Sequence, residues 1–184
     1  MIESRPIKVQ IFSDIVCPWC FIGKRRWDSA IKELVEVDVE LIWRPYQLYP
    51  GLPYEGIDRR EYLRRRYGDS TATGSAPQRI QEEAESVGIE LRYDLIDKIP
   101  NTAYSHYLLE WSLELGVQHD LAEALFQAYF CRGIDIGDTG SLINLCESIG
   151  MIARDVEEAL LSVAENVDMS TYVNFAQEQN IFSV

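Results

Sequence analysis

Two cysteines separated by two residues, Cys17 and Cys20, are the side chains whose type and spacing point most directly to chemistry. Such a pair either closes as a small disulfide or presents a thiolate. Apolar residues alternate before it (7–12), which predicts a strand, and recur at helical spacing after it (27–35), which predicts a helix. Cys17 is therefore expected at the helix N-terminus, where partial positive charge stabilises a thiolate. Pro18 fits the first helical turn, where its missing N–H would have no partner.

The two cysteines have different expected roles. Cys17 is the outer thiol and the candidate nucleophile, because a helix N-terminus lowers such a pKa from about 8.5 into the range of about 3.5–7.5. A pKa near the ambient pH serves attack best, since nucleophilicity falls as the pKa falls. Cys20 lies one helical turn further and is expected to be the more buried, resolving thiol. The alternative is an inert pair of buried cysteines.

Composition limits the class of protein. The chain has 184 residues, is 47% hydrophobic and carries a formal net charge of −13, which argues against nucleic acid and anionic membranes as partners. No apolar run approaches the roughly 18 residues that span a bilayer. The first residues run into the predicted strand without an apolar secretory region. We therefore predict a cytoplasmic protein.

The remaining cysteines do not indicate a metal site. In a reducing compartment four cysteines are not expected to be structural crosslinks. A zinc site would need a second ligand pair at short spacing, whereas Cys131 and Cys146 stand apart and only two histidines are present. We predict no metal, and we interpret Cys131 and Cys146 as buried free thiols. Whether they pair depends on a Cα separation that the sequence leaves open.

The remaining elements divide the chain into three parts. Alternation over 37–43 predicts a second strand, which makes a right-handed βαβ unit with parallel strands. Prolines and glycines over 45–56 predict an extended connector. From 58 to 166 helical periodicity prevails and no convincing strand is found. The predicted helices are 58–67, 76–87, 101–115, 121–132, 139–149, 155–164 and 171–179. The predicted domains are a βαβ half (1–55), a helical insertion (56–166) and a return to the first domain (167–184).

Four segments, in order, carry a family resemblance. They are Ser13 to Arg25 around Cys17-Pro18-Trp19-Cys20, then Trp43-Arg44-Pro45-Tyr46-Gln47-Leu48, then Pro100-Asn101-Thr102 with His106, then Ala124-Leu125-Phe126 through Asp135-Ile136-Gly137-Asp138. Together they resemble the FrnE-like branch of the DsbA-like proteins in the thioredoxin superfamily. The resemblance implies an α/β, thioredoxin-like fold with a large all-helical insertion.

The resemblance also implies a cis-proline loop that faces the dithiol and follows the return helix. In this sequence the last proline is Pro100, and the loop would come directly after Val184. We therefore expect that the C-terminal part of the sheet is missing from this chain by truncation, with completion by a partner chain as an alternative.

The resemblance implies a thiol–disulfide oxidoreductase acting on protein or small-molecule thiols and disulfides. The alternative is a glutathione-dependent isomerase or transferase, since 2-hydroxychromene-2-carboxylate isomerases and kappa-class glutathione transferases share the fold. They typically use a serine where Cys17 stands, and they need no resolving thiol, so Cys20 favours the first reading. A third class is a binding protein without a working site. No cofactor is required, glutathione is a possible co-substrate, and a homodimer remains open.

Six residues are candidates for substrate binding: Pro18, Trp19, Arg44, Gln47, Asn101 and His106. Pro18 and Trp19 lie between the cysteines and tune the thiolate. Arg44 and Gln47 follow the second strand, at the sheet edge where ligands bind in α/β proteins. Asn101 is a predicted N-cap, and the resemblance places it with His106 facing the dithiol. Packing of the connector, and a satisfied structural histidine, are the alternatives.

Several charged residues near the dithiol have two alternative interpretations. Lys24, Arg25 and Arg26 either add positive potential and meet an anionic substrate, or form a solvated helix face. Asp14 is expected to cap the loop, with proton acceptance as the alternative. His119 is expected at the surface.

Overall fold

The computed structural model describes residues 6–34, 37–68, 76–163 and 169–184. Strand β1 (Ile7–Ser13), helix α1 (Pro18–Glu33) and strand β2 (Val39–Pro45) form a βαβ unit with parallel strands. The register runs from Ile7 opposite Val39 to Ser13 opposite Pro45. The predicted βαβ unit is therefore confirmed, and β2 begins two residues later than predicted.

The helices of the insertion and the return helix all form. They are α2 (Arg59–Tyr67), α3 (Gln78–Glu85), α4 (Ala103–Glu114), α5 (Gln118–Arg132), α6 (Thr139–Ser148), α7 (Ala153–Val163) and α8 (Ser170–Glu178). Asp138 caps α6 by accepting a hydrogen bond from Ser141 N at 2.8 Å. A start of the next helix at Asp155 was the wrong prediction, because Asp155 N already donates to Ile152 O (3.0 Å) and α7 begins at Ala153.

Three short elements were missed. Strands β3 (Ile57–Asp58) and β4 (Lys98–Ile99) form an antiparallel pair, and a 3₁₀-helix, η2 (Tyr93–Leu95), precedes β4. The prediction that no strand follows residue 58 is wrong at β4, because a two-residue strand shows no alternation to detect. The pair joins the two ends of the segment that carries α2 and α3. Arg59 N donates to Asp97 O (2.8 Å) and extends this junction.

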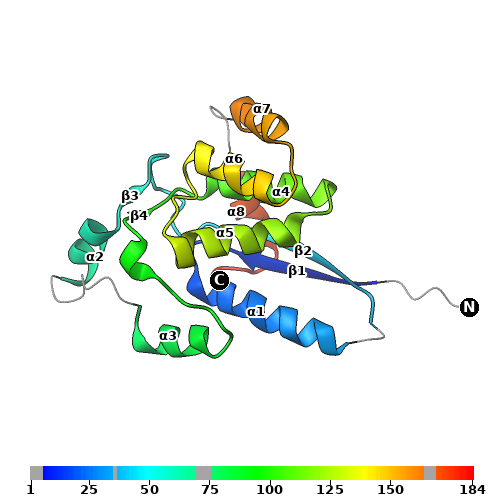
Figure 1. Cartoon of the computed structure of the whole chain (residues 1–184), viewed down its shortest axis with the longest axis horizontal. Helices are drawn as coiled ribbons and strands as arrows, with labels where there is room; N and C mark the ends of the chain where they lie inside the picture. The colour runs from blue at the N-terminus through cyan, green and yellow to red at the C-terminus, as the bar shows by residue number, and fades with distance from the viewer. Residues whose placement is uncertain (1–5, 35–36, 69–75, 164–168) are drawn as a thin grey trace, which may run out of the picture.

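Helices cover both faces of the β1–β2 pair (Figure 1). On one face α5 packs against β2. The ring centroid of Phe126 in α5 lies 5.1 Å from that of Phe21 in α1 and 6.1 Å from that of Trp43. On the other face α8 contacts β2, and Phe175 stacks on Phe12 at 5.8 Å. Burying each such ring stabilises the fold by about 1.5–3 kcal/mol. The sheet ends that carry the dithiol are thereby fixed between two helical layers.

The chain after α8 returns to the dithiol. In Figure 1 the C-terminal end lies beside the start of α1, and Val184 O lies 3.7 Å from Cys17 Sγ. The expected proline loop concerns residues after Val184 and stays a prediction, as does the division into domains. In the part of the chain that the structure describes, no helix is long and apolar enough to cross a membrane.

Candidate active site

The dithiol lies at the junction between strand β1 and helix α1. Cys17 is the N-cap of α1, with extended backbone (φ −92°, ψ 114°), and Pro18 occupies the first helical turn as predicted. Cys17 N donates to Asp14 O (3.0 Å), which closes the loop between strand and helix. Cys20 N donates to Cys17 O (3.1 Å) and begins the helix. Both thiols are free, and Cys17 is buried at 3% exposed whereas Cys20 is half-buried. The expectation that Cys17 is the outer thiol and Cys20 the more buried one is therefore wrong, because the C-terminal segment, with Val184 O 3.7 Å from Cys17 Sγ, covers Cys17.

The two thiols differ in acidity. A hydrogen bond from the Cys20 thiol lowers the pKa of Cys17 to about 7, although burial raises it. The backbone N–H groups of Cys20 and Trp19 lower it further, and the negative charge of Asp14 raises it. The same hydrogen bond, followed by burial, raises the pKa of Cys20 far above its ordinary value. At neutral pH the negative charge therefore resides on Cys17, as a nucleophile requires.

Asp14 and His106 form a buried pair beneath the dithiol. Their side chains are 1% and 0% exposed, and His106 Nε2 lies 3.3 Å from Asp14 Oδ1. The other carboxylate oxygen of Asp14 accepts a hydrogen bond from Leu48 N at 2.7 Å. Asp14 thus caps a loop as predicted, but the loop is the one after β2. His106 is buried and does not line an open cleft. Any effect on a substrate would therefore pass through its contact with Asp14.

Gln47 and Asn101, two of the predicted substrate-binding residues, lie in contact. Gln47 Nε2 donates to Asn101 Oδ1 (3.3 Å) and to Thr102 Oγ1 (3.4 Å), and all three residues are buried. The predicted N-cap is wrong by one residue, because Thr102 occupies the N-cap position of α4. Asn101 Oδ1 nevertheless accepts a hydrogen bond from Ala103 N (2.9 Å), a backbone N–H at the start of that helix. Asn101 Nδ2 donates to Leu52 O (2.8 Å). These contacts fix the connector after β2 against α4.

The described contacts of Arg44 are with residues outside this cluster. Its guanidinium binds Gln10 Oε1 (Nε, 2.7 Å) and Glu110 Oε2 (Nη1, 3.4 Å), and its Cζ lies 5.6 Å from the ring centroid of Phe175. Burial raises the pKa of Glu110, and Arg44 opposes that rise. The contacts described for Arg44 are thus with β1, α4 and α8, and its predicted role toward substrate stays a prediction.

Trp19 is the exposed member of the motif. It is 39% exposed, and the Arg79 guanidinium of α3 lies over its ring at 5.7 Å. Arg79 was not singled out from the sequence. It lies 60 residues after Trp19 in a polar helix, and the contact depends on how α3 packs on α1.

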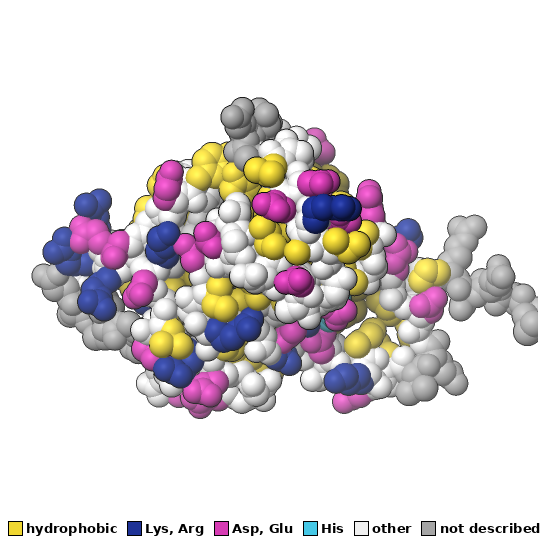
Figure 2. Space-filling model, turned by 45° about the horizontal axis from the view of Figure 1, so that its top comes forward, with side chains coloured by type: hydrophobic (Ala, Val, Ile, Leu, Met, Phe, Trp, Pro, Cys, Tyr) yellow, Lys and Arg dark blue, Asp and Glu magenta, His cyan; other side chains and the backbone are white. Residues whose placement is uncertain are grey.

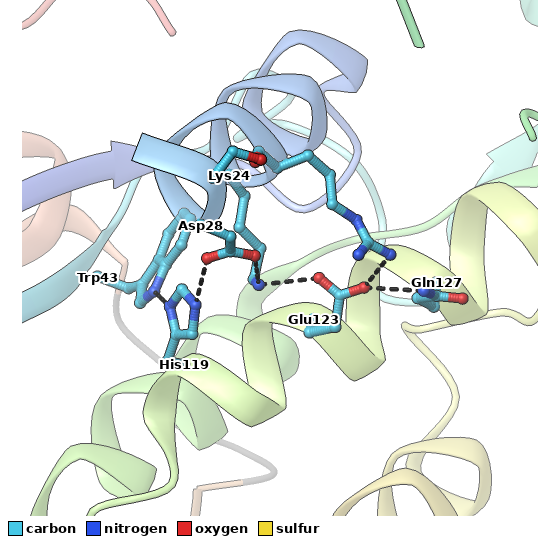
Figure 3. Close-up of polar contacts among 8 residues, drawn as sticks. Lys24, Asp28, Trp43, His119, Glu123 and Gln127 are labelled. Carbon is cyan, nitrogen blue, oxygen red and sulfur yellow. Dashed lines mark hydrogen bonds and ion pairs between the residues drawn. The ribbon is translucent and has the colours of Figure 1, made fainter. Parts of the chain in front are cut away.

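The basic run after the dithiol belongs to a network between α1 and α5 (Figure 3). Lys24 Nζ lies 2.8 Å from both Asp28 Oδ2 and Glu123 Oε2, and its side chain is 3% exposed. Glu123 also binds Arg25 Nη2 at 2.5 Å. A solvated face was therefore the wrong expectation for Lys24, and Arg26 alone is about half exposed. Glu123 lies too far along the sequence for a local pattern to pair it with Lys24.

His119 belongs to the same network. Trp43 Nε1 donates to His119 Nδ1 (3.1 Å), and His119 Nε2 lies 2.7 Å from Asp28 Oδ1 (Figure 3). The side chain is 39% exposed, so the expected surface position is correct only in part. The network fixes α1, and with it the dithiol, against β2 and α5.

A pocket of about 300 Å³ lies between the connector after β2 and the C-terminal segment. Tyr46, Gln47, Tyr172 and Phe182 contribute to its wall, and none of the described residues that line it is charged. Tyr46 Oη donates to Phe182 O (2.7 Å), which ties the connector to the segment that reaches Cys17. Among the described residues no cluster of histidine, cysteine, aspartate and glutamate is arranged to hold a metal ion.

Comparison with known proteins assigns the family. A family model described as a DSBA-like thioredoxin domain matches residues 8–184, so the chain belongs to the DsbA-like thioredoxin family. The protein YwbO of Bacillus subtilis (strain 168) is 30% identical over 154 residues, which cover 84% of this chain and 72% of YwbO. The fold class predicted from the sequence is confirmed, and the FrnE-like branch is compatible with it.

Solved structures agree with this family. The Streptomyces coelicolor protein SCO1869, described as a "probable DsbA oxidoreductase", has a TM-score of 0.82 and 26% identity, covering 97% of this chain and 78% of that one. The cytosolic disulfide reductase DsbM from Pseudomonas aeruginosa, in a structure with GSH, has a TM-score of 0.65 and 14% identity. That match covers 96% of this chain and 83% of DsbM, and it shows the fold alone.

Proposed function

We propose that the protein is a thiol–disulfide oxidoreductase in which Cys17 is the nucleophile and Cys20 the resolving thiol. The observation that carries the proposal is the division of acidity within the dithiol: the pKa of Cys17 falls to about 7 while that of Cys20 rises. A single activated thiolate beside a protonated second thiol is the arrangement that disulfide exchange needs. Membership of the DsbA-like family supports the same class of enzyme.

The reaction proceeds in two exchanges. The Cys17 thiolate attacks one sulfur of a substrate disulfide, the substrate S–S bond breaks, and the other substrate sulfur leaves as a thiolate. The Cys20 thiol then loses its proton and attacks Cys17 Sγ in the mixed disulfide. The first substrate sulfur leaves as a thiolate, so the substrate gains two electrons and the enzyme holds a Cys17–Cys20 disulfide. Run in reverse, the same steps oxidise a dithiol.

A glutathione-dependent isomerase or transferase is the second candidate, with Cys17 activating or replacing the glutathione thiol. The uncharged pocket beside the C-terminal segment, whose last residue Val184 contacts Cys17, is the observation in its favour, since it suits a small aromatic substrate. The retained Cys20 thiol, hydrogen-bonded to Cys17, favours the first candidate because isomerisation needs no resolving thiol. Under both proposals the protein acts in the cytoplasm. The oxidoreductase needs no cofactor and acts on thiol or disulfide substrates, whereas the isomerase or transferase uses glutathione as co-substrate.

Kinetics of cysteine variants test the proposal. We would measure reduction of a disulfide-bonded protein, and glutathione-dependent isomerisation, for the wild type, Cys17→Ser and Cys20→Ser. We expect Cys17→Ser to lose reduction and Cys20→Ser to stop at a mixed disulfide, visible as a mass increase. Cys131→Ser, which removes a free thiol outside the site, is the control. Unchanged turnover in Cys20→Ser would refute the dithiol mechanism, and glutathione-dependent activity in Cys17→Ser would favour the isomerase.

A further inference from the structure

Positive charge is concentrated on one helix of this acidic protein. The net charge is −13, yet five of the nine residues of α2 are arginine and only one is glutamate. Dark-blue side chains gather at the left edge of Figure 2, where Figure 1 places α2. Arg60 and Arg66 are exposed, and no carboxylate of the described residues pairs with either. The helix therefore presents cations that no carboxylate of the described residues neutralises.

Arg59 connects this helix to the dithiol. Its guanidinium lies 4.8 Å from the ring centroid of Tyr93 in η2, and no carboxylate within the described ranges pairs with it. Burial raises the pKa of Tyr93, Arg59 opposes that rise, and the charge of Cys17 adds to it. The Tyr93 ring packs edge-on against Phe130, with ring centroids 6.0 Å apart, and Phe130 stacks on Phe21, the residue after Cys20. These ring contacts connect the start of α2 to the dithiol end of α1.

Arg79 flanks the dithiol from α3. It lies over Trp19, the exposed residue between the two cysteines, and it too lacks a carboxylate partner in the described part of the chain. An ion pair between Arg26 and Glu83 fixes α3 against α1. A guanidinium that rests on an aromatic face keeps its N–H edges available for a carboxylate. Arg79 is thus positioned to contact a group that flanks a substrate sulfur.

The other side of the site carries no such charge. The pocket beside the C-terminal segment is lined by uncharged residues among those described. Exposed charges act over about 10 Å at moderate salt, so an unpaired arginine attracts a nearby carboxylate although the whole chain is negative. The connector after β2 and the C-terminal segment thus contribute an uncharged surface, whereas α2 and α3 contribute the unpaired arginines.

We propose that Arg59, Arg60, Arg66 and Arg79, here called the basic rim, select substrates by binding an acidic polypeptide segment that presents a disulfide to Cys17. This proposal rests on the proposed oxidoreductase function and names its substrate class. A nine-residue helix is about 13 Å long, which matches about four extended residues and exceeds a small disulfide. A polyphosphate chain has the same sign of charge but carries no disulfide, so it can occupy the basic rim only as an inhibitor and not as a substrate of Cys17.

Peptide substrates of matched structure test this proposal. Three synthetic peptides carry the same disulfide loop with flanks of aspartate, asparagine or lysine, and their single-turnover reduction by the reduced protein is followed at low salt. We expect the acidic peptide to react about tenfold faster than the neutral one, with an advantage that shrinks as salt rises. In Arg59→Gln/Arg79→Gln the ratio of acidic to neutral rates should fall toward one.

Two further variants separate charge from folding. Arg79→Lys keeps the charge and should retain most of the preference for the acidic peptide. Lys32→Gln removes one exposed positive charge at the far end of α1, roughly 22 Å along the helix from Cys17, and should leave the ratio unchanged. Thermal unfolding of each variant shows whether it folds.

Each outcome bears on a definite claim. Equal rates for the three peptides in the wild type, or an unchanged ratio in the double arginine variant, would overturn the basic rim while leaving the oxidoreductase intact. Failure of the wild type to reduce any peptide would instead refute the proposed function. If the double arginine variant slows the reduction of glutathione disulfide but leaves the peptide rates unchanged, the basic rim binds small anions instead. Stronger inhibition by a DNA oligonucleotide than by a disulfide-free acidic peptide would also contradict the proposal.

Discussion

His106 Nε2 lies 3.3 Å from Asp14 Oδ1, and both side chains are withdrawn from solvent beneath the dithiol. Asp14 also accepts from Leu48 N through its side chain and from Cys17 N through its backbone carbonyl. One residue therefore connects the nucleophile, the connector after β2 and helix α4. A buried carboxylate with this many partners is stabilising only while the partners remain, because an unpaired buried charge is costly.

Removing one partner of this pair should destabilise the fold. His106→Leu leaves Asp14 buried with one donor fewer, and we expect the free energy of unfolding to fall by about 3 kcal/mol in urea denaturation. Asp14→Asn keeps an acceptor for Leu48 and should cost less. If the two residues act together, the double variant should show a coupling energy above about 1 kcal/mol. Additive losses would show that the pair is not coupled.

The acidity of Cys17 should respond to its two neighbours in opposite directions. Its pKa is about 7, so alkylation by iodoacetamide should increase with pH through a midpoint near 7. Cys20→Ala removes the hydrogen bond that lowers the pKa, so the midpoint should rise toward the ordinary value of about 8.5. Asp14→Asn removes a negative charge that raises the pKa, so the midpoint should fall below 7.

The control for this titration is a thiol outside the site. Burial raises the pKa of Cys146 to about 12, so it should stay unreactive through the same range. A Cys17 midpoint that ignores the Cys20→Ala substitution would contradict the assigned cause.

Lys24 should contribute more to stability than its neighbour Arg26. Lys24→Met leaves Glu123 and Asp28 without a buried cation, and we expect a loss of about 2 kcal/mol in the free energy of unfolding. Arg26→Met breaks an ion pair whose arginine is half exposed, and it should cost less than about 1 kcal/mol. Equal losses would mean that burial of Lys24 adds nothing to its pairing. Thermal denaturation of the two variants under the same conditions provides the comparison.

Local features of the sequence predicted the reactive part of the site. The change from alternating to helical spacing around Cys17, with Pro18 after it, is sufficient to place a cysteine at a helix N-terminus. The seven predicted helices form for the same reason, because each carries its own periodicity and breakers. Their ends coincide with the prediction or shift by up to three residues, as expected where caps compete, and the predicted end at residue 164 lies outside the described residues.

Contacts between distant segments could not be predicted in this way. Lys24, within a run of three basic residues, has the pattern of a solvated face, and only the packing of α5 brings Glu123 to it. His106 lies on a helix whose buried residues occupy much of its circumference, so periodicity does not show which element it faces. Arg59 reaches Tyr93 through the two-residue β3–β4 pair, which has no sequence period.

The protonation of His119 follows from its two neighbours and can be measured. The Trp43 indole N–H only donates, so His119 Nδ1 at 3.1 Å must accept and carries no hydrogen. The hydrogen therefore sits on Nε2, which donates to Asp28 Oδ1 at 2.7 Å. Burial raises the pKa of Asp28, but Lys24 and His119 outweigh it and hold the pKa below its usual range, so the acceptor stays charged.

We expect the ¹⁵N NMR pattern of an imidazole in the Nε2–H tautomer. Trp43→Phe removes the indole donor and should release the ring to exchange between tautomers. Asp28→Asn keeps an acceptor oxygen and should leave the Nε2–H form dominant. An Nδ1–H tautomer at neutral pH would contradict the hydrogen-bond direction assigned to this network.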